Sequence, residues 1–171
     1  MRRVIIFAIA SIMMLSFSTN LDAKNYKQAI SIDPLDFLVS KVFNATYEHQ
    51  LSKENSFTVF FSYYNYSDYW SAYGIGGSYR WYLTDLLKDQ KIPIEGLSVG
   101  PMARVSFWSS DYYQLEDDNS IYLVIGGEAA YKWTFNDFIV EPILRLGFGV
   151  TDISGLGYSG WGAGVNVGYA W

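Results

Sequence analysis

The 171-residue sequence contains no cysteine and only one histidine. The absence of cysteine excludes a disulfide framework and a cysteine-ligated metal site. Beyond residue 17, no apolar run approaches the ~20 residues that a membrane-spanning helix needs. Hydrophobic residues still make up 50% of the chain, so they must be spread over alternating strands. The length fits a single domain.

Basic residues are also scarce. The chain has 12 Lys and Arg against 17 Asp and Glu, which gives a formal net charge of −5. An acidic chain binds the phosphate backbone of nucleic acids poorly, so no nucleic-acid partner is expected.

The N-terminus has the pattern of a cleavable signal peptide. Arg2 and Arg3 precede an apolar run from Val4 to Phe17, which is too short to cross a membrane comfortably. We predict cleavage after Ala23, so that residues 1–23 are a signal peptide and residues 24–171 are the mature barrel. Cleavage after Ser18 and retention of the segment as an anchor are the alternatives.

The end of the chain alternates between large apolar and small residues. Large apolar residues occupy alternate positions from Trp161 to Trp171, and glycine, alanine and asparagine occupy the positions between them. A soluble β-barrel places its large apolar side chains inside. This strand offers only small residues, glycine, alanine and asparagine, for an inward face and large apolar residues for an outward face. The pattern therefore predicts a strand whose apolar face meets a lipid bilayer.

Similar alternation predicts six more strands and, by parity, an eighth. The clearest segments are 138–150, 121–133, 97–108 and 73–83, and the weaker ones are 57–66, whose phase is undetermined, and 39–49. Single-chain membrane barrels have even strand numbers, so residues 26–32 supply the first strand, followed by a proline-favoured turn at 33–36. Connections at 50–55, 84–94 and 134–137 lie at the end that holds both termini, and those at 67–72, 109–119 and 151–159 lie at the other end. The predicted fold is all-β: an eight-stranded antiparallel up-and-down transmembrane β-barrel.

Four stretches of the sequence carry a family likeness: Gly168-Tyr169-Ala170-Trp171, Tyr47-Glu48, residues 76–83 and Val99-Gly100-Pro101. In these stretches the chain resembles the small eight-stranded outer-membrane β-barrel proteins of bacteria. It implies a location in the bacterial outer membrane, contact with outer-membrane lipid, and recognition of Tyr169 and Trp171 by the barrel-assembly machinery. Members range from structural anchors to adhesins and lipid-modifying enzymes, so the resemblance leaves the function open.

Seven charged residues are predicted to face the lumen. They are Glu48, Arg80, Arg104, Glu128, Lys132, Glu141 and Arg145. An eight-stranded barrel is narrow enough to be filled by its own side chains, and an unpaired buried charge costs on the order of several kcal/mol. We therefore predict that these charges pair and plug the lumen. A narrow ion-conducting path along the same residues is the alternative.

No catalytic or metal-binding constellation emerges from the sequence. His49 lies at the end that holds both termini, with Ser52 in the following turn, and no acid converges on them as acyl-transfer catalysis requires. We predict no enzymatic activity and no cofactor, with an outer-leaflet lipid-modifying enzyme as the alternative. Residues Asp111, Glu116, Asp117 and Asp118 could offer oxygen ligands to Ca²⁺, but their spacing matches no known calcium loop, so we predict no metal site.

Aromatic residues in the connections at the end opposite the termini are candidates for a binding surface. Tyr69, Trp70, Tyr112 and Tyr113 either belong to the girdle at the membrane interface or anchor an unknown surface ligand. The sequence thus predicts a structural envelope protein or an adhesin-like surface module. A secreted lipocalin-like barrel is the rival fold, and it requires the large apolar faces to point inward.

Overall fold

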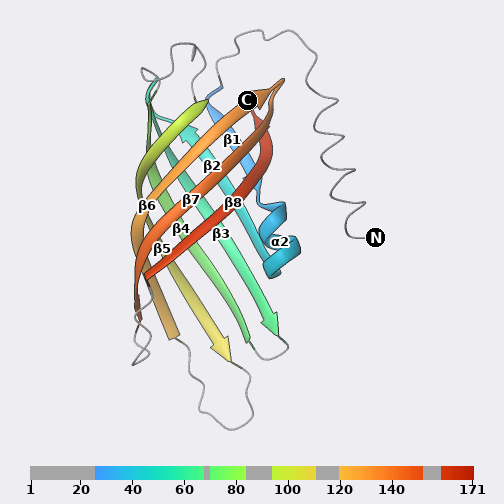
Figure 1. The fold of residues 1–171 in the computed structure, drawn as a ribbon, viewed down its shortest axis with the longest axis vertical. Helices are drawn as coiled ribbons and strands as arrows, with labels where there is room; N and C mark the ends of the chain where they lie inside the picture. The colour runs from blue at the N-terminus through green and yellow to red at the C-terminus, as the bar shows by residue number, and fades with distance from the viewer. Residues whose placement is uncertain (1–25, 68–69, 84–93, 111–119, 152–158) are drawn as a thin grey trace.

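The protein is an eight-stranded closed barrel with strands paired in sequence order (Figure 1). The computed structural model describes residues 26–67, 70–83, 94–110, 120–151 and 159–171. The strands are β1 (Gln28–Ile32), β2 (Val42–Gln50), β3 (Asn55–Ser67), β4 (Trp70–Tyr82), β5 (Gly96–Ser110), β6 (Ser120–Phe135), β7 (Phe138–Thr151) and β8 (Ser159–Ala170). Every neighbouring pair is antiparallel, so the predicted up-and-down barrel is confirmed. The proposed signal peptide, residues 1–23, lies outside the described residues and stays a prediction.

The barrel closes where its first and last strands meet. β1 pairs with β2 on one side and with β8 on the other, and Ile30 lies opposite Tyr169. The N–H of Gln28 donates to the carbonyl oxygen of Trp171 at 3.0 Å, and the N–H of Trp171 donates back at 2.9 Å. We call this the near end of the barrel and the opposite one the far end. The first strand, which was inferred only from parity, is therefore present.

Large apolar side chains cover the outside of the barrel. Ile125, Leu146 and Phe148 are 56%, 57% and 74% exposed, whereas Arg80 and Glu141 are 0% and 1% exposed. The predicted phases of β2 and β4 to β8 are confirmed by this burial pattern. The lipocalin-like alternative is wrong, because it requires these apolar faces to pack inside.

Bulky side chains fill the lumen by lying over glycines of neighbouring strands. A Cβ on Gly76 would collide with the ring of Phe60, and one on Gly149 would collide with the hydroxyl of Tyr122. Phe60 is accordingly buried, while its neighbour Phe61 faces outward. The glycine-rich inward faces thus provide the room that large lumenal side chains need.

A short helix, α2 (Pro34–Ser40), stands where the sequence predicts a turn. Asp33 is its N-cap and accepts hydrogen bonds from the N–H groups of Leu35 at 3.0 Å and Asp36 at 3.1 Å. Pro34 follows in the first turn, where its missing N–H costs nothing, and Lys41 ends the helix with a φ of 57°. The turn prediction is wrong because Asp-Pro begins a helix as readily as a turn. Within the described part of the chain, no helix is long and apolar enough to cross a membrane.

The near-end connections that the structure describes are short. Asn136 and Asp137, with φ values of 47° and 74°, form the two-residue link between β6 and β7, so the predicted turn at 134–137 is confirmed. Positive φ at both central residues suits the right-handed twist of a tight hairpin. β2 and β3 are joined by Leu51 to Glu54, which agrees with the predicted connection at 50–55.

Candidate functional site

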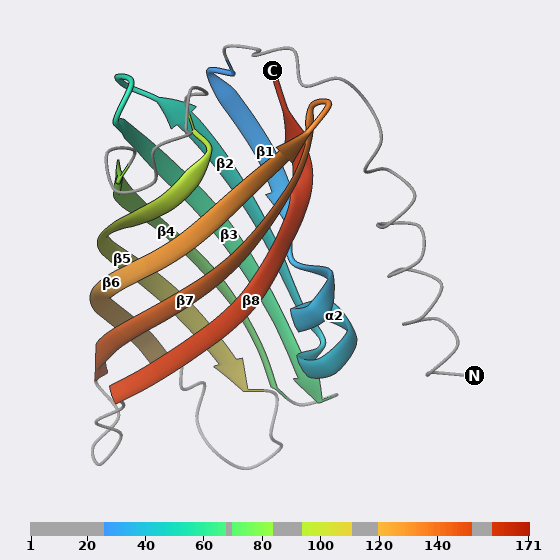
Figure 2. The same cartoon turned by 45° about the horizontal axis from the view of Figure 1, so that its top comes forward.

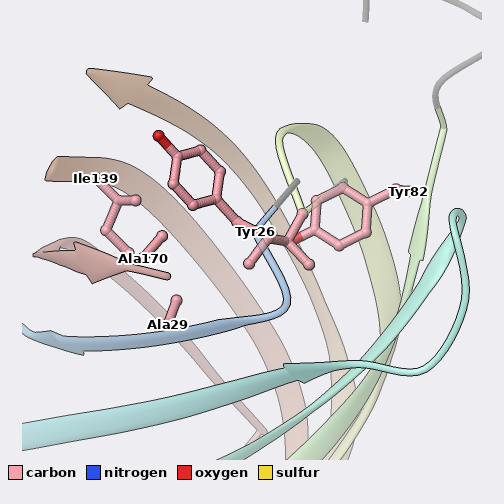
Figure 3. Packing of buried hydrophobic residues seen from close by; sticks show 6 residues of the cluster. Tyr26, Ala29, Tyr82, Ile139 and Ala170 are labelled. Atoms are coloured by element: carbon pink, nitrogen blue, oxygen red, sulfur yellow. The ribbon is translucent and has the colours of Figure 1, made fainter. Parts of the chain in front are cut away.

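Polar and apolar layers alternate along the lumen. Near the closing end, buried apolar residues form a cluster that we call the near-end cluster (Figure 3): Tyr26, Ala29, Tyr82, Ile94, Ile139 and Ala170. A second group, the far-end cluster, consists of Val42, Tyr64 and Ala72, with Trp108 packed against it. Between the two lies a layer of buried charges, which we call the ion-pair layer.

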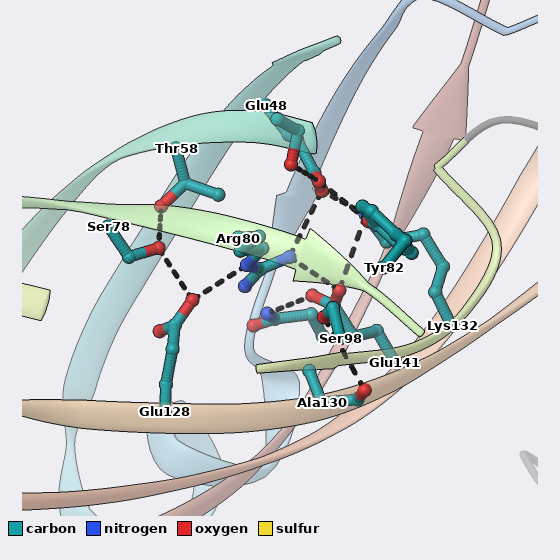
Figure 4. A network of polar contacts seen from close by, with 12 residues as sticks. Glu48, Thr58, Ser78, Arg80, Tyr82, Ser98, Glu128, Ala130, Lys132 and Glu141 are labelled. Atoms are coloured by element: carbon teal, nitrogen blue, oxygen red, sulfur yellow. Dashed lines mark hydrogen bonds and ion pairs between the residues drawn. The ribbon is translucent and has the colours of Figure 1, made fainter. Parts of the chain in front are cut away.

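Arg80 on β4 is the centre of the ion-pair layer (Figure 4). Its Nε lies 2.6 Å from Oε1 of Glu128, and its Nη1 lies 3.0 Å from Oε2 of Glu48 and 2.7 Å from Oε1 of Glu141. These carboxylates come from β6, β2 and β7, so one guanidinium ties together strands on different sides of the lumen. All four side chains are almost completely excluded from solvent.

Two more cations complete the layer. Lys132 pairs with Glu48 and lies 3.2 Å from Oε1 of Glu141, and Nε of Arg145 lies 3.2 Å from Oε2 of Glu128. Three carboxylates are therefore matched by three cations. The layer is neutral as a whole, which offsets the cost of burying each charge.

Hydroxyl and amide groups also donate hydrogen bonds to the three carboxylates. Each donor lies on an inward face: Ser56 and Tyr82 donate to Glu48, Ser78 donates to Glu128, Asn166 donates to Glu141, and Thr58 is hydrogen-bonded to Ser78. The alternation of β8 predicts that Asn166 faces inward but not that it binds a carboxylate, and the roles of Ser56, Thr58, Ser78 and Tyr82 were not predicted. The polar residues at alternate positions of β3 were the available signal, but the adjacent Phe60 and Phe61 obscure it.

Arg104 is set apart from the other six predicted lumenal charges, which the structure brings together. Its guanidinium lies over the ring of Tyr64, 5.7 Å from the ring centroid, and its Nε has no hydrogen-bond partner among the described residues. Its strand partners are Gly76 and Val124, neither of which offers a carboxylate. Arg104 thus belongs to the far half of the lumen, beyond the ion-pair layer.

The C-terminal aromatics lie on the outside of the barrel at its near end. Tyr169 and Trp171 are about half exposed, and their rings stack with centroids 6.2 Å apart. Among the other proposed binding residues, Tyr69, Tyr112 and Tyr113 lie outside the described residues, as do the acidic residues 111 and 116–118, and Trp70 is the first residue of β4. Their roles stay predictions.

His49 packs among aromatic side chains near the end of β2. Its Nδ1 lies 3.4 Å from the hydroxyl of Tyr47, and its ring centroid lies 5.6 Å from that of Phe57. Across the described ranges, no contact joins His49 to a serine hydroxyl or to a carboxylate, and no group of three or more potential metal ligands occurs. Within the described part of the chain, the structure therefore does not bring His49 together with the serine and acid that a Ser–His–acid arrangement needs.

A closed eight-stranded barrel with an apolar exterior and an ion-paired lumen has the architecture of a transmembrane β-barrel. In structure, the chain is similar to the N-terminal β-barrel domain of Pseudomonas aeruginosa OprF, with a TM-score of 0.51 and 14% sequence identity over 88% of this chain and 100% of that one. It is also similar to the Yersinia pestis outer membrane protein Ail, with a TM-score of 0.52 and 11% identity over 86% of this chain and 100% of that one. No family model and no curated protein matches the sequence. At these identities, the likeness is one of fold.

Proposed function

We propose that this protein is an integral barrel of the bacterial outer membrane, with a plugged lumen and a structural role in the envelope. The observation that carries the proposal is the neutral ion-pair layer that spans the lumen inside an apolar exterior. Outer-membrane lipid contacts the exterior, and the barrel-assembly machinery reads Tyr169 and Trp171 at the end of β8. The near end then faces the periplasm and the far end faces outward. A non-enzymatic role is part of this proposal.

The ion-pair layer opposes axial conduction. An ion that passes along the lumen must separate Arg80 from carboxylates that lie 2.6 to 3.0 Å away. Separating buried, hydrogen-bonded charges costs on the order of several kcal/mol. The near-end cluster is a second obstacle to an ion. The lumen is therefore closed along its axis.

Planar-bilayer recordings test this closure. The wild-type protein is expected to give no discrete channel openings, and Arg104→Gln, which removes a lumenal charge outside the ion-pair layer, is expected to stay closed as well. Arg145→Gln removes the most exposed cation of the layer and is expected to be the variant most prone to openings. Discrete, charge-sensitive channels in the wild type would overturn the plug.

The loops at the far end support a second role as an adhesin-like surface module. Tyrosine and tryptophan are effective anchors at protein interfaces, and residues 109–119 include Tyr112 and Tyr113. Replacing residues 111–119 with a Gly/Ser linker is expected to abolish cell adhesion while the heat-modifiable gel mobility of the folded barrel is kept. A matched replacement of the near-end loop Leu51 to Glu54 is expected to leave adhesion intact. Unchanged adhesion after the first replacement would contradict this role.

A further inference from the structure

The wall of the barrel changes from strand to helix between β8 and β2. The β1 ladder with β8 ends at the pair formed by Ile32 and Val167, although β8 continues back to Ser159. Beyond Ile32 the chain turns into α2, which contacts both β2 and β8 (Figure 2). We call the boundary between α2 and this unpaired part of β8 the seam.

The seam leaves peptide groups of β8 without a strand partner. The hydrogen bond from Trp171 N–H to Gln28 shows that the odd-numbered residues of β8 direct their backbone groups toward β1. Val165 and Ala163 therefore point theirs at the seam. An open sheet edge is not tolerated against hydrocarbon, where each unsatisfied peptide group costs on the order of several kcal/mol. Something has to cover this edge, and in the structure α2 lies against it.

Polar tethers hold α2 over the seam. Oδ1 of Asp33 caps the helix, and the Asp33 carboxylate also accepts from the N–H of Val165 on β8. A Cβ on Gly164 would collide with Oδ2 of Asp33, so glycine lets the carboxylate approach β8 this closely. On the other side, Nδ2 of Asn44 on β2 donates to Asp36 at 2.6 Å. No residue of α2 is buried, so the helix is attached to the wall rather than built into a core.

Apolar side chains lie on both sides of the seam, alongside its polar tethers and the buried polar residues Ser31 and Thr46. The outer surface of α2 presents four large exposed residues: Leu35, Phe37, Leu38 and Val39. On the lumenal side, Phe60 of β3 lies opposite Thr46 of β2, and Thr46 lies opposite Ser31 near the end of β1. Met102 is buried at an inward position of β5. At Gly162 the inward side of β8 borders open space, because a Cβ there would meet nothing within 4 Å.

We propose that the seam is a lateral opening through which the acyl chain of a membrane lipid enters the far half of the lumen. This inference rests on the proposed membrane location. α2 covers this opening when it is closed, and the Asp33 carboxylate holds α2 against β8. An acyl chain fits because the entrance lies on the lipid-facing surface and apolar side chains lie behind it, namely those of Phe60, Met102 and the far-end cluster, with the Arg104 guanidinium over Tyr64 of that cluster. The ion-pair layer lies at the bottom of this half, where the Arg145 guanidinium sits over the Phe60 ring.

Photo-crosslinking from the bilayer tests the opening on the full-length mature protein. The protein is folded into phosphatidylcholine vesicles that contain a phosphatidylcholine with a diazirine midway along one acyl chain, and labelled residues are assigned by fragmentation mass spectrometry. Outward Ile125 and Leu146 are expected to be labelled in any membrane barrel. Inward Phe60 and Met102 are expected to be labelled as well, whereas the inward Ser56 and Ser98 of the near half are not.

Two substitutions at the ends of α2 separate opening from general disturbance. Asp33→Ser keeps an N-capping oxygen but is too short to reach β8, so labelling of Phe60 and Met102 is expected to rise severalfold. Lys41→Gly relaxes the left-handed residue at the other end of the helix and is expected to label as the wild type does. Labelling confined to outward residues in both the wild type and Asp33→Ser would overturn the lateral opening alone. If Ile125 and Leu146 also stay unlabelled, the membrane location itself is overturned.

Discussion

Replacing Arg80 with methionine is expected to destabilise the barrel by about 3–5 kcal/mol, the cost of removing one partner from a buried ion pair. Arg80 contacts Glu48, Glu128 and Glu141, all of which are nearly inaccessible to solvent. Without it, Lys132 must neutralise Glu48 and Glu141, and Glu128 keeps only Arg145, whose side chain is the most exposed in the layer. One carboxylate is then left in excess inside a narrow lumen.

Urea unfolding in lipid vesicles, followed by tryptophan fluorescence, measures this loss. Arg104→Met is the matched control: it removes an arginine from the same lumen but from no ion pair among the described residues, and it is expected to cost less than about 1 kcal/mol. If Arg80→Met does not fold, adding Glu128→Gln is expected to restore folding, because it removes the excess negative charge. Equal losses for Arg80→Met and Arg104→Met would show that the ion-pair layer does not stabilise the barrel.

Replacing Ile125 with arginine is expected to cost about 2–4 kcal/mol, the range for a cation at the lipid face near the middle of a membrane barrel. Ile125 is 56% exposed on β6, between Ala103 of β5 and Phe148 of β7. Its side chain therefore meets only what surrounds the barrel. In a bilayer, the guanidinium must either leave water or deform the lipid around it.

The same substitution at the end of a strand is the control. Ser109 is exposed near the far end of β5, where arginine is expected to cost only about 0–1 kcal/mol because a long cationic side chain there reaches water. Unfolding free energies of both variants in vesicles give the comparison. If both substitutions prove nearly neutral, the exterior is bathed in water, and the membrane location is wrong.

The sequence predicts strand phase wherever one face is consistently larger than the other. β4 to β8 show this alternation over most of their length, and the closed ring of eight strands follows from it by parity. β3 is different because Phe60 and Phe61 are adjacent, and the choice between them depends on the space that Gly76 leaves on another strand. α2 is different for a similar reason: Asp33-Pro34 starts a turn or a helix equally well, and contacts with β2 and β8 accompany the helix.

The sequence also does not predict which of the lumenal charges contact one another. Arg80 and Arg104 look alike in the sequence, because each lies between two outward apolar residues on a strand. Which of them meets the carboxylates is decided by strand stagger, since the register places Arg104 opposite Gly76 and Val124 instead. Strand stagger is a property of the whole ring, so local alternation predicts which way a side chain points but not its partner.

The junction of β1 with β8 joins the two most distant parts of the described chain, whereas every other strand pairs with its sequence neighbour. Hairpins form early because their loops are short, but this last pairing has to await the final residues and bears the entropy of closing the longest loop. Until then, the growing sheet has two unpaired edge strands, which can pair wrongly with other chains. Pairing of β1 with β8 is therefore the step at which an aggregation-prone sheet becomes a barrel without free edges at its near end.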